Sequence, residues 1–198
     1  MMRSFGIGML AVCLAAVSAG CSRSPRVTFY TLEPGARIEA AAASAVPAVA
    51  VGPVTLPEVV DRPQLVVRVA ANRVEILETH RWAEPLKSEI PRLIAGNLGR
   101  LLGSSRVSFY LQHAAALADY RVLVDIQRFE SSPGEAVTVE AAWSLRHGGG
   151  APKTGHSLVR EPVATEGYDP LVAAYGRAIL AVSADLARAI RSEAALGL

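Results

Sequence analysis

Two stretches of the chain carry apolar residues at helical spacing. The first predicts a helix that ends at Gly103 and places these residues on one face: Leu86, Ile90, Leu93, Ile94, Leu98, Leu101 and Leu102. The second predicts a long closing helix that starts at Pro170 and carries a stripe formed by Tyr175, Ile179, Val182, Leu186 and Ile190. Each helix would pack its apolar face against a core.

The start of the first helix depends on how Pro91 is accommodated. If Pro85 is the first helical residue, Pro91 lies inside the helix, removes a backbone hydrogen bond and costs about 3 kcal/mol. If Ser88 is the N-cap, Pro91 falls in the first turn, where its missing N–H matters little. We favour the second arrangement and expect residues 84–87 to form an entry turn.

Shorter segments rich in β-branched and aromatic residues predict strands. These segments are 27–32, 48–54, 64–69, 73–77, 106–111, 120–129, 137–146 and 154–163, with a short helical or coil bridge at 114–118. Polar breaks of hairpin length join the third segment to the fourth and the sixth to the seventh. Strands interrupted by one helix and closed by another predict an α+β fold, a largely antiparallel sheet with two main helices packed on one face.

The first 21 residues have the pattern of a secretory signal peptide. Arg3 precedes an apolar run over residues 5–17, and three small residues then precede Cys21. The apolar run is shorter than the roughly 20 residues that cross a bilayer, so cleavage is favoured over an uncleaved transmembrane helix. An ordinary cut near Ala19, which would leave a free thiol, is the alternative to a lipoprotein signal.

A cysteine directly after the small residues favours the lipoprotein signal. We expect removal of residues 1–20 and acylation of Cys21, through an S-diacylglycerol thioether and an N-acyl chain. Several acyl chains make membrane attachment effectively permanent. Ser22 stands where an inner-membrane retention signal usually has Asp, which favours the outer membrane and its periplasmic face.

The remaining chain has the length of one domain. Residues 21–47 would form the lipid anchor, a tether and a candidate first strand, and residues 48–198 a single α+β domain. The net charge is +2, or +1 after removal of the signal, and both signs are scattered, which gives no footprint for nucleic acid. Cys13 leaves with the signal and Cys21 is acylated, so no disulfide or cysteine-ligated metal site is expected within one chain.

Signals for catalysis are missing from the sequence. It has no P-loop, no G-x-S-x-G elbow and no H-E-x-x-H pair, and its four histidines lack metal-ligand spacing, so we expect no metal and no cofactor. Glu58, Asp61 and Glu84 could act as acid and base, although capping and ion pairs explain them more simply. We therefore predict that the protein is not an enzyme.

The most distinctive stretch is VGPVTLPEVVDRPQLVVR over residues 51–68, followed by HRWAEPL over residues 80–86. Glycine and prolines make a stiff connection between two strands, and the tryptophan is a large anchor that ends a strand before the helix. These segments supply residues that either fix a corner of the fold or face a partner: Asp61, Arg62, Arg68, Arg81, Trp82 and Glu84.

Together with Tyr30-Thr31-Leu32, these segments resemble, in the same order, the ABC-transport auxiliary lipoprotein family, the PqiC/YmbA-like outer-membrane lipoproteins. The resemblance rests on motifs in the first half of the mature chain and on element order in the rest. It implies a non-catalytic subunit of an MCE-type system that moves lipids or other hydrophobic molecules between two membranes. The family supplies no catalytic residues to transfer to this chain.

The partners implied by the resemblance are a periplasmic MCE-domain protein and inner-membrane transporter subunits. The outer membrane would be contacted through the lipid anchor, and a homo-oligomeric ring would suit a symmetric tube. Nucleic acid is not expected. An alternative is a free-standing periplasmic lipoprotein that binds a lipid or a small hydrophobic ligand, which would need an apolar cavity of several hundred cubic ångströms. A periplasmic hydrolase ranks last.

Overall fold

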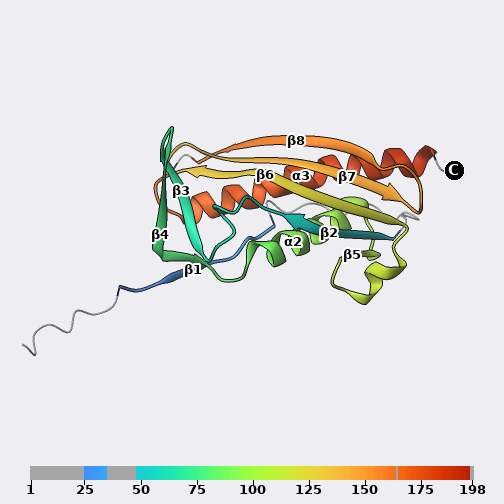
Figure 1. The fold of residues 1–198 in the computed structure, drawn as a ribbon, viewed down its shortest axis with the longest axis horizontal. Coiled ribbons are helices and arrows are strands. Elements are labelled where there is room, and N and C mark those ends of the chain that lie inside the picture. The colour runs from blue at the N-terminus through green and yellow to red at the C-terminus, as the bar shows by residue number, and fades with distance from the viewer. Residues whose placement is uncertain (1–24, 35–47, 164, 197–198) are drawn as a thin grey trace, which may run out of the picture.

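The computed structural model describes residues 25–34, 48–163 and 165–196, which form two sheets and two long helices (Figure 1). The predicted signal peptide, its cleavage, the acylation of Cys21 and most of the predicted tether lie outside the described residues. The α+β fold class predicted from the sequence is confirmed.

Both predicted helices are present. They are α2 (Leu86–Leu102) and α3 (Asp169–Leu196), and α2 ends at Gly103 in the left-handed conformation, as predicted. The five stripe residues predicted for α3 are all buried. By length and composition alone α3 could cross a membrane, but more than half of its apolar window is buried inside the domain, as in the core helix of a soluble fold.

The predicted start of α2 is wrong. Pro85 occupies the N-cap position, and its carbonyl oxygen accepts hydrogen bonds from the N–H groups of Ser88 and Glu89, at 2.8 and 3.1 Å. Pro91 therefore lies inside the helix. The buried side chains of Leu86 and Glu89 hold this first turn against the core, which offsets the loss of one backbone hydrogen bond.

All eight predicted strands are present, with shifted ends, and the predicted bridge is a short 3-10 helix, η1 (His113–Leu117). The strands are β1 (Thr28–Tyr30), β2 (Val49–Thr55), β3 (Gln64–Ala70), β4 (Arg73–Trp82), β5 (Val107–Phe109), β6 (Tyr120–Ser132), β7 (Ala136–His147) and β8 (Lys153–Pro162). The two predicted hairpins are the antiparallel pairs β3–β4 and β6–β7. The predicted loop after residue 129 is shorter than expected because β6 continues to Ser132.

The strands form two mixed sheets instead of one largely antiparallel sheet. A three-stranded sheet has the order β1-β4-β3, and a five-stranded sheet has the order β5-β2-β6-β7-β8. The pairs β1–β4, β2–β5 and β2–β6 are parallel. Parallel neighbours need a crossover connection, and the β2–β5 crossover contains β3, β4 and α2, so local sequence patterns do not reveal the pairing.

The two helices pack on one face of the five-stranded sheet, and the three-stranded sheet stands at one end of the molecule, with β5 and η1 toward the other end (Figure 1). The helix–sheet interface is filled by fully buried apolar side chains, including those of Val122, Val139, Ile179 and Leu186. This arrangement places the end of β4 and the start of α2 at the corner where the two sheets and both helices meet.

Candidate functional site

Two segments that lie far apart in the sequence meet at this corner. Residues 61–63 precede β3, and residues 82–86 connect β4 to α2. Together they line a pocket of about 340 Å³. The Trp82 N–H donates to the Pro63 carbonyl oxygen (2.7 Å) and so joins the segments directly. The pocket is therefore built from the two stretches that the sequence analysis singled out.

Trp82 is buried and forms the base of the corner. Its ring lies edge-on to Tyr175 of α3, with centroids 6.0 Å apart, and 6.4 Å from Phe129 of β6. Phe129 and Tyr175 stack on each other with centroids 4.0 Å apart, and burial raises the pKa of Tyr175. This aromatic cluster ties both sheets to α3, so Trp82 occupies a fold-corner position.

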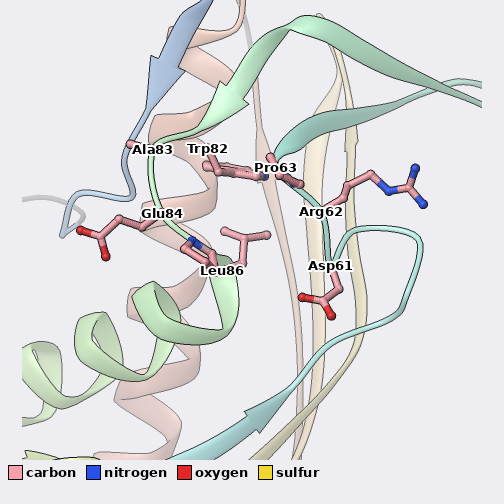
Figure 2. A pocket seen from close by; sticks show the side chains of 8 residues that line it. Asp61, Arg62, Pro63, Trp82, Ala83, Glu84 and Leu86 are labelled. Carbon is pink, nitrogen blue, oxygen red and sulfur yellow. The ribbon is translucent and has the colours of Figure 1, made fainter.

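Charged side chains surround the pocket and point away from its centre, where Trp82, Pro63 and Leu86 lie (Figure 2). Asp61 forms an ion pair with Lys87 at 2.6 Å, and Glu84 forms an ion pair with Arg92. Arg62 forms no ion pair with any described residue. The rim therefore has two paired carboxylates and one guanidinium that no described residue pairs with, around an apolar base, which suits the binding of a partner side chain better than acid–base chemistry.

The other two predicted site residues lie elsewhere. Arg68 on β3 binds Glu130 on β6 through two nitrogens, at 2.6 and 3.2 Å, and this hydrogen bonding raises the pKa of the guanidinium group. Arg81 on β4 bonds to the backbone and side chain of Glu78. Of the six predicted residues, the structure thus brings four to the pocket, while Arg68 instead links the two sheets.

The contacts of the histidines do not assemble a catalytic group with the candidate carboxylates. His80 bonds to the Tyr30 hydroxyl at 2.8 Å, His147 stacks on Tyr120, and His156 bonds to Glu140 at 3.0 Å. Within the described ranges, no group of three or more His, Cys, Asp or Glu side chains could hold a metal ion.

Three charged residues near the corner were missed by the sequence reasoning. Lys87 and Arg92 neutralise the rim carboxylates, and Glu89 is only 7% exposed and accepts a hydrogen bond from the Leu32 N–H at 2.7 Å. A signal for Glu89 was available. It lies three residues after Leu86 and four before Leu93, so a carboxylate interrupts the apolar stripe of α2.

The fold and the corner pocket define an α+β domain with a surface pocket at the corner between its two sheets. The sequence profile of the family described as "ABC-type transport auxiliary lipoprotein component" matches residues 30–187. The chain belongs to this family, as the motifs predicted, and is an auxiliary lipoprotein component of ABC-type transport.

Two crystal structures share the fold. One is of an uncharacterized protein, with 20% identity and a TM-score of 0.69, covering 84% of this chain and 99% of the other. The second is of protein XCC0632 from Xanthomonas campestris, of the family DUF330, with 19% identity and a TM-score of 0.65, covering 81% of this chain and 93% of the other. At these identities the likeness concerns the fold alone. No curated protein matches the chain.

Proposed function

We propose that the protein is a non-catalytic, outer-membrane lipoprotein subunit of an MCE-type transport system that moves lipids or other hydrophobic molecules between membranes. It docks the periplasmic MCE-domain conduit to the outer membrane and supports membrane integrity. Acylated Cys21 holds the protein at the periplasmic face of that membrane, and a homo-oligomeric ring matches a symmetric conduit.

The observation that carries this proposal is the corner pocket. Both of its segments belong to the motifs that resemble the family, and they converge although Pro63 and Trp82 are 19 residues apart in the sequence. Because Asp61 and Glu84 are already paired with cations, the pocket offers an apolar base and a rim in which the Arg62 guanidinium is the charge that has no ion pair among the described residues. Such a pocket fits an anchoring side chain of a protein partner.

The alternative of a free-standing lipid carrier has less support. A carrier of this fold would hold its ligand between the sheet and the helices, and that interface is filled by buried side chains. None of five surface cavities formed by the described residues is lined by a residue of α3.

The test is recovery of partners from crosslinked outer-membrane fractions. Ala83 is exposed and lines the pocket, so Ala83→Trp adds a large side chain at the pocket's rim while the Ala83 N–H keeps its bond to the Tyr30 carbonyl oxygen. Ala71, also exposed, lies at the β3–β4 turn, and Ala71→Trp is the matched control. We expect an MCE-domain protein to be recovered with the wild type and the control and to be lost with Ala83→Trp.

Two further results would contradict parts of the proposal. Recovery of the partner with Ala83→Trp at the wild-type level would exclude the corner pocket as the docking site. If the wild-type protein resides in the outer membrane but recovers no MCE-domain protein, docking itself is wrong, and the lipid-carrier function gains support. Cys21→Ala tests the anchor separately, since its loss of partner recovery would show that attachment is needed.

A further inference from the structure

The three-stranded sheet has one face turned away from the core. This sheet stands at the end of the molecule where the described chain begins, at residue 25 (Figure 1). Tyr30 of β1 lies level with Trp82 of β4, and both are buried, so they point into the core. Side chains alternate along a strand, so Phe29 points the other way, and its side chain is 63% exposed. We call this side of the sheet the outer face.

Strand β4 extends the outer face toward the turn that joins it to β3. Leu77 is buried, so Ile76 lies on the outer face, and Val74 follows two positions earlier on the same side. Both side chains are exposed, as is that of Val27 just before β1. A sheet face in contact with water normally carries polar side chains, so these apolar residues indicate a contact surface. We call Val27, Phe29, Val74 and Ile76 the outer-face patch.

Two exposed arginines flank the outer-face patch. Arg26 and Arg73 each directly precede a patch residue, and neither forms an ion pair with any described residue. The carboxylate of Glu78, further along β4, is already bonded to Arg81. Glu75 lies level with a buried residue of β3 and so belongs to the other face. The patch therefore combines exposed apolar side chains with two cations that are available to an anion.

The chain ahead of β1 limits how far the outer-face patch can lie from the expected lipid anchor. Val27 is six residues after Cys21, and an extended chain of that length spans at most about 22 Å. If Cys21 is acylated, as in the proposed function, the patch is held this close to the bilayer surface. Covalent attachment so near raises the effective concentration of the patch at the membrane, so a modest contact suffices.

We propose that the outer-face patch lies on the surface of the membrane that holds acylated Cys21 and gives the domain a second contact with the bilayer. The apolar side chains enter the boundary between the headgroups and the acyl chains. Arg26 and Arg73 donate to the lipid phosphates. The acyl chains attach the protein, whereas the patch sets the orientation of the domain on the membrane.

This orientation leaves the corner pocket available to a protein partner. None of the patch residues lines that pocket. The end of the molecule that carries β5 and η1 points away from the bilayer, because it lies opposite the three-stranded sheet (Figure 1). The location at a membrane rests on the proposed function, whereas docking of the conduit uses other residues, so the two can fail independently.

The first experiment measures which face of the domain touches lipid. The protein, purified from membranes, is reconstituted into vesicles of phosphatidylethanolamine and phosphatidylglycerol that carry bromine on the acyl chains near the headgroups, where it quenches nearby tryptophan. Phe29→Trp and Ile76→Trp place the probe on the patch, and Leu158→Trp, at an exposed position of β8, is the matched control. Each variant also carries Trp143→Phe, so the buried Trp82 is the one other tryptophan.

We expect quenching at positions 29 and 76 to be at least about threefold stronger than at position 158, because the patch side chains reach the acyl boundary. Adding Phe29→Ser to the Ile76→Trp protein should reduce the quenching at position 76 by about half, since the patch loses its largest exposed side chain. Leu158→Ser should leave it unchanged. Quenching at positions 29 and 76 that is no stronger than at position 158 would overturn the proposal.

The second experiment tests whether a second copy of the chain covers the outer-face patch instead. Hydrogen exchange over residues 26–30 and 74–78 is measured in non-ionic detergent at increasing protein concentration and then in the vesicles. We expect slower exchange in the vesicles and no dependence on protein concentration in detergent. Protection that rises with concentration in the absence of lipid would assign the patch to a second copy and overturn the membrane contact.

Failure of the proposed function gives different results. If the protein is not acylated, it will be missing from the membrane fraction, which contradicts the anchor, and the same vesicles are then added to the free protein to test the patch. If docking is wrong, no MCE-domain protein is recovered, although the quenching pattern is unchanged. Phe29→Ser should still recover the partner, because Phe29 does not line the corner pocket.

Discussion

Replacing Trp82 by alanine tests whether this motif residue holds the corner of the fold. Truncation of a fully buried large aromatic residue costs about 3–5 kcal/mol. The rings of Phe129 and Tyr175 each form an aromatic pair with Trp82, and two such pairs account for about 1–3 kcal/mol of that sum. The remainder comes from lost apolar burial and from the cavity left between the two sheets and α3. A loss of this size is a large fraction of the stability of one domain.

The assay is urea unfolding followed by circular dichroism, with Trp82→Phe as the control. Phenylalanine keeps an aromatic ring at the corner, so we expect it to recover at least half of the lost stability. The chain contains two tryptophans, so a Trp143→Phe background reports the emission of Trp82 alone. That emission should be typical of a buried indole and should shift to the red on unfolding.

The result that would refute this reasoning is a loss below about 1 kcal/mol for Trp82→Ala. If such a stable variant also failed to recover the MCE-domain partner, Trp82 would act mainly by contacting that partner. A large loss of stability that Trp82→Phe largely restores would place the residue in the structural core.

Three further predictions concern stability. Because burial raises the pKa of Glu89, the folded chain holds this proton more tightly than the unfolded chain, and stability falls as pH rises from about 4.5 through the raised pKa. Glu89→Gln should therefore gain stability relative to the wild type as pH rises, and a pH-independent difference in urea midpoints would contradict this. A Cβ at position 155 would lie 2.1 Å from the Trp143 ring, so Gly155→Ala should lower the free energy of unfolding by about 1–3 kcal/mol and alter Trp143 fluorescence. An unchanged free energy and unchanged fluorescence would show that the ring moves aside freely. Arg68→Gln removes the partly exposed ion pair with Glu130 and should cost no more than about 1 kcal/mol, with the cost shrinking in high salt in thermal unfolding measurements.

Local patterns predicted the elements because each element has its own period. The α3 stripe from Tyr175 to Ile190 repeats at helical spacing, and the turn after β6 brings two long strands together within a few residues. The two motif segments likewise indicated a corner of the fold, although not the pocket that they form there. In these cases the information that decides the structure lies within a short stretch of sequence.

Other features depend on contacts between distant residues, and the sequence patterns did not show them. The pairing of β1 with β4 joins residues about 50 positions apart, and no local period encodes it. The start of α2 was misplaced because local preference favoured Ser88, whereas burial of Leu86 outweighed the cost of Pro91 inside the helix. Glu89 stands out in the sequence as a carboxylate in the apolar stripe of α2, but its partner, the Leu32 N–H, is seen only when the two segments are placed side by side.

The parallel pairing of β1 with β4 determines how mechanical load enters the domain. A chain anchored ahead of residue 25 pulls on the N-terminal end of β1, whose residues 28–30 lie level with residues 80–82 of β4. Tension along β1 loads the backbone hydrogen bonds between these two segments at the same time, instead of breaking them one after another. The next contact along the chain is the hydrogen bond from the Leu32 N–H to Glu89, which connects this segment to α2. If the membrane moved relative to a bound partner protein, the load would fall first on the hydrogen bonds between β1 and β4. The aromatic cluster of Trp82, Phe129 and Tyr175 would carry load only after those bonds had broken.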